Sequence, residues 1–348
     1  MKWLHNSRWV SFFLSEKRMK NGFACGRIDM NWLDEGNGFY GRDWFLGMEK
    51  AHPERWELLF SAPSGAALAC RRRPKDRVAL IVSGGGSDGP WVPGFVGDGL
   101  ADAAVIGAPY TAPNAYAIYQ AAKALDQKRG VLLLYNNFMG DYLNNDMAAE
   151  LLGLEGIAAQ QIAFCDDMGS ALGEPRENRA GRSGGALLIR IAAKAAREGK
   201  SLRETAALVR RAGERLVTLS VTADPQTGRA EFGRGFSDEP GFLVKEGTTL
   251  RQTAADMIGM LLEDVRPRPG EKIALLVNRL RLTSYADGYV FAGHLYRELS
   301  ARFPVLQMRV GAYNNILDLY GFTVSLLCAD ETVQPYLSGA VSTDSFLL

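Results

Sequence analysis

The chain has 348 residues and a formal net charge of +1, with 47% hydrophobic and 23% charged residues. This length predicts two compact domains, and the composition is typical of a globular protein. Because a balanced charge creates no strong overall field, we expect neither nucleic acid nor a membrane as a partner. The 4 cysteines form no CxxC pair, so we expect reduced thiols, no metal and no cofactor.

The first 22 residues are unusually basic, with five Lys or Arg and one Glu. Their apolar stretch, residues 9–14, is too short for a signal-peptide core or a membrane span. We expect residues 1–42 to be a poorly ordered extension, a targeting peptide, or the product of a start codon placed too early. No other segment approaches the length of a membrane helix, so we expect no membrane insertion. Reduced thiols fit a reducing compartment, and we expect a cytoplasmic protein.

From about residue 43 onward, strand-like and helix-like segments alternate. Two short apolar runs, residues 78–82 and 131–135, are predicted to be buried strands, and residues 158–167 are predicted to be a third strand that ends in acidic residues. Helical spacing occupies residues 115–128, and a further helix is expected after Asp141. Strands alternating with helices of this length predict βαβ units and a mainly parallel sheet.

The second half of the chain continues this alternation. A strongly amphipathic helix is predicted over 185–200, and the next begins with a capping box formed by Ser201 and Glu204. Residues 215–223 alternate with period 2, which predicts a strand with one solvated face. The remaining expectations are a strand over 274–278 and a long ordered loop over 224–241.

These patterns predict an α/β protein with two α/β domains and mainly parallel sheets. We expect an N-terminal domain over 43–190 that carries a glycine loop, and a C-terminal domain over 191–348.

The glycine loop, SGGGSDGP at 83–90, follows the first buried strand. Consecutive glycines leave backbone N–H groups open to a ligand, and ligands of open α/β sheets bind at the carboxyl ends of strands. The loop is neither a P-loop nor a GxGxxG motif, and a tight connection without function is an equal alternative. The binding candidates of this loop are Gly85, Gly86, Ser87 and Asp88.

A second polar turn follows the second buried strand and contains Asn136, Asn137 and Asp141. We interpret Asp141 as a base or a hydroxyl acceptor and the two asparagines as substrate-binding residues. The competing interpretation of Asp141 is a helix N-cap, a position that Asp favours. Capping competes with function in the same way for Asp166 and Asp167, which end the third strand.

Nine segments occur in an order and spacing that resemble one protein family. They are AHP (51–53), SGGGS (83–87), GFVGDGL (94–100), GD (140–141), DD (166–167), AGRSG (180–184), EFGRGFSDEPG (231–241), VNRL (277–280) and GAYNNILDLYGFTVSLL (311–327). Together they make the chain similar to the substrate-binding subunit of dihydroxyacetone kinase over about residues 43–340.

The resemblance implies a site for a short ketose, formed by the glycine loop, the aspartate turn and a histidine. In that family the histidine holds the substrate as a covalent hemiaminal, and a separate subunit carries the nucleotide. The resemblance therefore implies that this chain binds no ATP itself, and it also implies a homodimer. Phosphoryl transfer with a nucleotide-carrying or phosphoryl-donor partner subunit is an open alternative at this point.

This chain departs from the family pattern at three places. The glycine loop lacks its histidine, and Asn136-Asn137 stand where the family has Lys-Asn. We matched the Gly-His-Ser context of the covalent histidine to Gly213-Glu214-Arg215. None of the three histidines, His5, His52 and His294, aligns with the covalent position, so the resemblance implies non-covalent binding of a ketose or a related polyol or phosphate.

Two further hypotheses remain open at this stage. If Glu214 and Asp141 share one pocket, their acid/base chemistry would suit an isomerase or lyase acting on a small sugar or sugar phosphate. The other is a non-catalytic sensor or coactivator. Arginines flank the expected site, namely Arg176, Arg179, Arg182 and Arg234. Of these we predict that Arg182, which matches the family's AGR, binds substrate.

Overall fold

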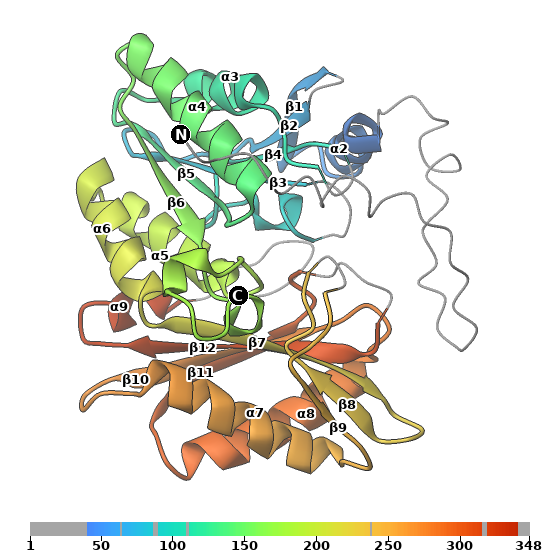
Figure 1. The fold of residues 1–348 in the computed structure, drawn as a ribbon. Helices are drawn as coiled ribbons and strands as arrows, with labels where there is room; N and C mark the ends of the chain where they lie inside the picture. Colours follow the sequence, from blue (N-terminus) through green and yellow to red (C-terminus); the bar gives the residue numbers. More distant parts are fainter. Residues whose placement is uncertain are drawn as a thin grey trace, which may run out of the picture.

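The computed structural model describes residues 40–62, 65–85, 90–108, 111–236, 239–314 and 319–339. Three of the predicted site residues, Gly86, Ser87 and Asp88, lie outside these ranges. The last three residues of the predicted N-terminal extension are helical, because helix α2 spans Tyr40–Ala51. Helices and two six-stranded sheets alternate in layers, with one sheet above the other in Figure 1.

The first sheet has the strand order β1-β2-β4-β3-β5-β6. Its strands are β1 (Trp56–Ala62), β2 (Gly65–Cys70), β3 (Ala79–Gly84), β4 (Ala103–Ile106), β5 (Val131–Asn136) and β6 (Ala159–Phe164). Strands β4, β3, β5 and β6 are parallel, whereas β2 is antiparallel to both β1 and β4. The three predicted strands, β3, β5 and β6, are confirmed; the alanine-rich β2 and the short β4 gave no clear strand pattern.

Two pairs of helices cover this sheet. Helices α3 (Ala115–Leu125) and α4 (Met139–Leu154) pack on its outer face. Helices α5 (Gly185–Arg197) and α6 (Leu202–Gly213) lie between the two sheets (Figure 1). The capping box of Ser201 and Glu204 is present as predicted. The domain boundary expected at residue 190 falls inside α5. This helix contributes to a hydrophobic core that also contains residues of both sheets.

The second sheet has the order β11-β10-β12-β7-β8-β9. Its strands are β7 (Leu216–Asp224), β8 (Arg229–Phe232), β9 (Leu243–Lys245), β10 (Lys272–Arg279), β11 (Val305–Gly311) and β12 (Gly321–Ala329). Helices α7 (Leu250–Val265) and α8 (Tyr285–Ser300) cover its outer face, and the short α9 (Gln334–Leu337) packs on α5.

The prediction of a mainly parallel sheet fails in this second half. Among the described strand pairs of this sheet only β10 and β11 run parallel; the other four pairs are antiparallel. The expected loop over 224–241 contains strand β8, which pairs with β7 through the turn at 225–228. Short turns can join antiparallel strands without a helix, so the βαβ pattern of the first half did not carry over.

The prediction that β7 has one solvated face is also wrong. Leu216 to Thr222 are all buried, although their polar residues alternate with apolar ones as expected. On the polar face, Thr218 Oγ1 donates over 2.5 Å to Asp166 Oδ2 at the edge of the first sheet, and Ser220 Oγ donates over 2.8 Å to the Arg234 carbonyl in the segment after β8. Period 2 marks two different faces of a strand, but it does not identify water as the neighbour of the polar one.

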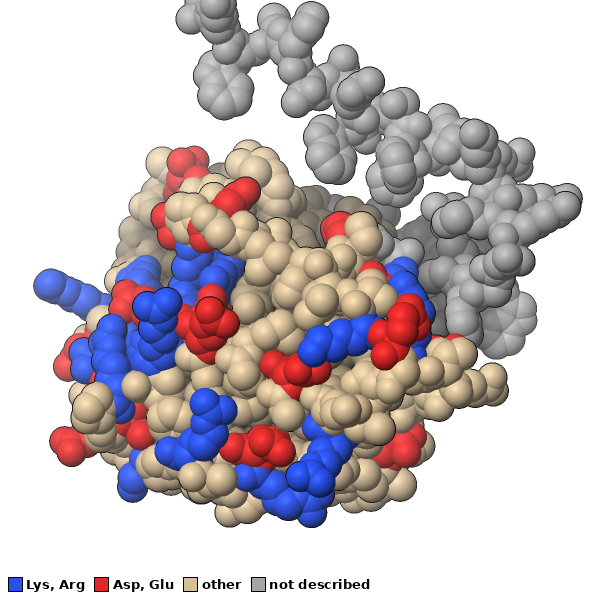
Figure 2. Space-filling view, turned by 60° about the horizontal axis from the view of Figure 1, so that its bottom comes forward, with Lys and Arg blue, Asp and Glu red and all other residues tan. Residues whose placement is uncertain are grey.

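The described surface mixes charges of both signs. On the face shown in Figure 2, basic and acidic side chains are interspersed with uncharged ones. Within the ranges that the structure describes, no helix combines the length and the apolar character needed to cross a membrane.

Candidate functional site

The carboxyl ends of three neighbouring parallel strands bring several predicted residues to one edge of the first sheet. Gly85 directly follows β3, Asn136 is the last residue of β5, and Asp141 lies in the first turn of α4. Asp166 and Asp167 follow β6 at the same edge. This is the side of an open parallel sheet on which ligands bind, and it faces the polar side of β7.

Asp141 is a buried carboxyl group with an unused oxygen. Its side chain is 7% exposed, and Oδ1 has no hydrogen-bond partner among the described residues. Burial raises the pKa of Asp141 to about 7, so the group changes its charge near neutral pH. The N-cap of α4 is Phe138, so the alternative interpretation of Asp141 as the N-cap is wrong.

Asn145 supports Asp141 from one helical turn further along. Its Nδ2 donates to the Asp141 carbonyl over 2.8 Å and to Ser83 Oγ over 3.0 Å. Ser83 lies in β3 just before the glycine loop, so this fully buried amide joins the strand that leads into the loop to the helix that carries Asp141.

The two asparagines after β5 have different surroundings. The Asn136 side chain is buried, and neither its Oδ1 nor its Nδ2 has a hydrogen-bond partner among the described residues. A buried amide without partners is costly, so Asn136 is suited to hydrogen-bond a ligand. In contrast, Asn137 Nδ2 donates to the carbonyls of Glu177 and Arg179, at 3.0 and 2.8 Å, and thereby fixes the segment before α5.

The acidic pair after β6 serves the protein's own backbone and side chains. The buried Asp166 accepts hydrogen bonds from the Arg182 and Gly184 N–H groups and from Thr218. Asp167 caps the short helix Met168–Ser170 and forms an ion pair of 2.7 Å with Arg182 Nε. The capping interpretation therefore holds for Asp167.

Glu214 is not brought to this edge, contrary to the hypothesis of a shared pocket with Asp141. It is the exposed C-cap of α6, whereas Asp141 is buried, and Glu214 does not contribute to the raised pKa of Asp141. The two residues sit at ends of helices on opposite faces of the first sheet (Figure 1). Sequence matching alone selected Glu214, and matching gives no information about where a helix ends in space.

The segment that reaches the start of α4 instead is the one after β8. The Phe236 ring lies 5.1 Å from the ring of Phe138, the residue that caps α4. Sequence reasoning missed Phe236, although it lies in the segment EFGRGFSDEPG that carried part of the family resemblance. The motif therefore contained Phe236, but it gave no information about which residues Phe236 contacts in space.

The flanking arginines are engaged by the protein itself. Arg176 and Arg179 both bind Asp264 at the end of α7, at 2.9 and 2.6 Å respectively. These two ion pairs attach the segment before α5 to helix α7, which covers the outer face of the second sheet. Arg182, predicted to bind substrate, forms an ion pair with Asp167.

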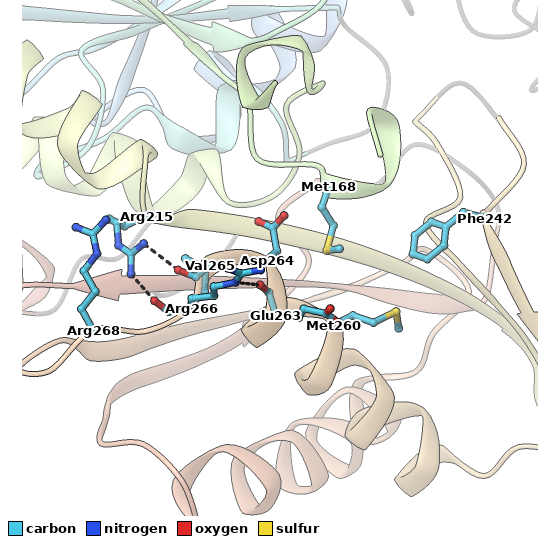
Figure 3. Close-up of a pocket in the computed structure, with 9 residues that line it drawn as sticks. All are labelled: Met168, Arg215, Phe242, Met260, Glu263, Asp264, Val265, Arg266 and Arg268. Atoms are coloured by element: carbon cyan, nitrogen blue, oxygen red, sulfur yellow. Dashed lines mark hydrogen bonds between the residues drawn. The ribbon is translucent and has the colours of Figure 1, made fainter. Parts of the chain in front are cut away.

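The larger hollows described on the surface lie elsewhere. A groove of about 720 Å³ runs from Arg215 and Arg268 to an apolar end at Met168 and Phe242 (Figure 3). In it, Arg215 donates to the Val265 carbonyl over 2.8 Å, one of the carbonyls at the end of α7. A second hollow of about 680 Å³ lies between α2 and residues 90–94. Asp141 lines neither of these two hollows. We place the candidate site at Asp141 because this buried carboxyl group has an oxygen without a hydrogen-bond partner among the described residues.

The edge of the first sheet therefore offers a defined chemistry. A carboxylate at Asp141 can accept a hydrogen bond or a proton from a hydroxyl group near neutral pH, and the Asn136 amide can donate to a carbonyl oxygen or accept from a hydroxyl. Together these groups suit a small polyhydroxylated ligand.

Comparison with known proteins identifies the family. The family model described as the Dak1 domain matches residues 46–345. The dihydroxyacetone-binding subunit DhaK of the PTS-dependent dihydroxyacetone kinase from Lactococcus lactis is 31% identical over 276 residues, which cover 75% of this chain and 83% of that protein. D-erythrulose kinase from Mycolicibacterium smegmatis is 30% identical over 298 residues, covering 82% of this chain and 51% of that protein, so the chain spans about half its length.

A solved structure confirms the fold. The dihydroxyacetone kinase operon co-activator DhaQ superposes with a TM-score of 0.77 at 25% identity, covering 87% of this chain and 97% of that one. The family predicted from nine short segments is thus supported both by sequence over most of the chain and by the arrangement of two sheets. The chain belongs to the Dak1 domain family and is a divergent relative of the dihydroxyacetone-binding subunits of dihydroxyacetone kinases.

Proposed function

We propose that this protein binds a short ketose, such as dihydroxyacetone or erythrulose, without forming a covalent bond to it. The observation that carries the proposal is Asp141, a buried carboxyl group with an unused Oδ1 and a pKa raised by burial to about 7. Asp141 accepts a hydrogen bond from a ketose hydroxyl, and Gly85, which directly follows β3, contributes its backbone N–H group.

The histidines support the non-covalent mode. His52 packs edge-on against Trp56, with ring centroids 5.3 Å apart, at the end of α2. His294 lies on α8, with Nδ1 3.0 Å from Arg297 Nη2. Neither of these two imidazoles donates a hydrogen bond to Asp141 Oδ1. His5 lies outside the described residues.

In this proposal the ketose is held for phosphoryl transfer from a partner subunit. Asp141 takes the proton of the attacking hydroxyl, and its near-neutral pKa suits a general base at physiological pH. The partner carries the phosphoryl donor, since the relative from L. lactis is named as the dihydroxyacetone-binding subunit of a PTS-dependent kinase. We further expect a homodimer, which light scattering at micromolar concentration checks; a monomer would contradict that expectation.

The test is a thermal-shift titration with dihydroxyacetone, glyceraldehyde, erythrulose and their phosphates. A ligand present at about 100 times its dissociation constant stabilises the folded state by about 2.7 kcal/mol, a measurable shift. We expect neutral ketoses to raise the melting temperature of the wild type but not that of Asp141→Asn. Asp146→Asn, on the same helix, is the matched control and keeps the shift. A wild type that responds to no neutral ketose contradicts the proposal.

A second candidate function is that of a ligand-binding co-activator without turnover. It is favoured by the similarity to the operon co-activator DhaQ over 97% of that chain. The two functions differ in product formation. Incubation with the partner subunits of a family kinase, their phosphoryl donor and dihydroxyacetone yields dihydroxyacetone phosphate if the chain is a kinase subunit, and yields none if it only senses the ketose.

A further inference from the structure

Arg182 is the most enclosed of the arginines near the site. Only 6% of its surface is exposed, and its Nε donates to Asp167 Oδ2 over 2.7 Å. On the other side, its Nη2 donates to the Arg234 carbonyl. The guanidinium thus joins the turn after β6 to the segment after β8, and little of it is left to meet a ligand.

The segment after β8 is held at the same point by two further contacts. Ser220 Oγ on β7 donates to the same Arg234 carbonyl over 2.8 Å. The backbones of Gly169 and Gly233 approach so closely that a Cβ on Gly169 would lie 2.7 Å from the Gly233 Cα. Arg182 is therefore the side-chain element of a tight junction between two segments far apart in the sequence.

Beyond this junction lies an aromatic contact with the site. The Arg182 guanidinium carbon lies 5.8 Å from the centre of the Phe236 ring, a cation–π geometry. Phe236 in turn packs on Phe138, which caps the helix whose first turn contains Asp141. A continuous series of contacts thus connects the Asp167–Arg182 ion pair to the first turn of α4.

We propose that Arg182 is a positioning residue: it fixes the 233–236 segment against α4, and through Phe236 and Phe138 it sets the geometry of the ketose site. This inference rests on the proposed function and changes the role predicted from the sequence, in which Arg182 contacted substrate. An arginine is required because its planar fork donates from Nε to Asp167 and from Nη2 to the Arg234 carbonyl at once, whereas a lysine ammonium is a single point.

The test compares Arg182→Lys with Arg179→Lys as the matched control. Arg179 lies in the same segment and is comparably buried, and it forms an ion pair with Asp264 instead of contacting the 233–236 segment. We expect Arg182→Lys to weaken dihydroxyacetone binding about tenfold, the size expected for losing one charge-assisted hydrogen bond. Arg179→Lys should leave the affinity within about twofold of wild type, although both variants lose some thermal stability.

A second measurement reports on how firmly the 233–236 segment is held. Limited trypsin digestion with mass spectrometry measures cleavage after Arg234, which we expect to accelerate in Arg182→Lys and to remain at the wild-type rate in Arg179→Lys. If Arg182→Lys does not fold, Phe236→Leu removes the aromatic contact alone and should weaken binding while keeping the ion pair.

The outcomes separate the two proposals. Wild-type affinity and wild-type cleavage in Arg182→Lys, or equal losses in both lysine variants, would overturn the positioning role. If the wild type binds no ketose, the proposed function fails, and the cleavage comparison still decides whether Arg182 holds the segment.

Discussion

Ser83 and Asn145 share a buried side-chain hydrogen bond, with Asn145 Nδ2 3.0 Å from Ser83 Oγ. It joins β3, just before the glycine loop, to α4, and the same amide donates to the Asp141 carbonyl. Two walls of the candidate site are thus fixed relative to each other by one side chain.

We expect Asn145→Ala to lower the free energy of unfolding by about 1–3 kcal/mol, because it leaves the buried Ser83 hydroxyl without its partner. Urea denaturation measures this change. Asn144→Ala, at the neighbouring half-buried position, should change stability by less than about 0.5 kcal/mol. Equal effects of the two substitutions would show that the buried bond contributes little.

The stability of the protein should depend on pH through Asp141. Its pKa in the folded state, about 7, lies above the ordinary value for Asp, so the folded state binds this proton more tightly than the unfolded one. Its stabilising contribution is complete below about pH 4 and is lost as pH rises through about 7. Asp141→Asn should therefore exceed the wild type in stability by roughly 2–4 kcal/mol at pH 8, with the difference shrinking toward pH 4.

Ketose affinity should change with pH in the opposite direction. The ionised carboxylate is the better hydrogen-bond acceptor, so the affinity of the wild type for dihydroxyacetone should rise between pH 6 and pH 8. Calorimetric titration across this range checks the slope. An affinity that does not change across pH 7 would show that the ionisation of Asp141 does not control binding.

Gly181 should be required next to Asn136. A Cβ at position 181 would lie 2.5 Å from Asn136 Oδ1 and 2.6 Å from the Phe164 carbonyl oxygen. Because a backbone atom is among these neighbours, Gly181→Ala should cost about 1–3 kcal/mol of stability and weaken ketose binding. Gly153→Ala is the control, since its Cβ meets nothing within 4 Å in the last turn of α4, and it should stabilise the protein by up to about 1 kcal/mol.

Glu214→Gln should leave ketose binding unchanged, because Glu214 is an exposed helix end away from Asp141. Parallel thermal-shift titrations of Glu214→Gln and Asp141→Asn with dihydroxyacetone check this expectation. A loss of binding in Glu214→Gln as large as that in Asp141→Asn would restore the acid/base pair considered from the sequence.

The sequence by itself determined many of the local elements, and it determined the family. Apolar runs such as 131–135 and the Ser201–Glu204 capping box depend on residues close in the chain, and the structure has both. The family could be identified because nine segments keep their order along the chain, and order is a property of the sequence.

Only the tertiary structure decided which distant segments meet. Glu214 and Phe236 are 73 and 95 residues from Asp141 in the sequence, and nothing in their local pattern shows that Phe236, not Glu214, belongs to the segment that packs against the first turn of α4. The same holds for the polar face of β7, which pattern analysis assigned to water and which the fold covers with Asp166 and Arg234. Periodicity gives the face of an element on which a residue lies, whereas what covers that face is set by packing between elements.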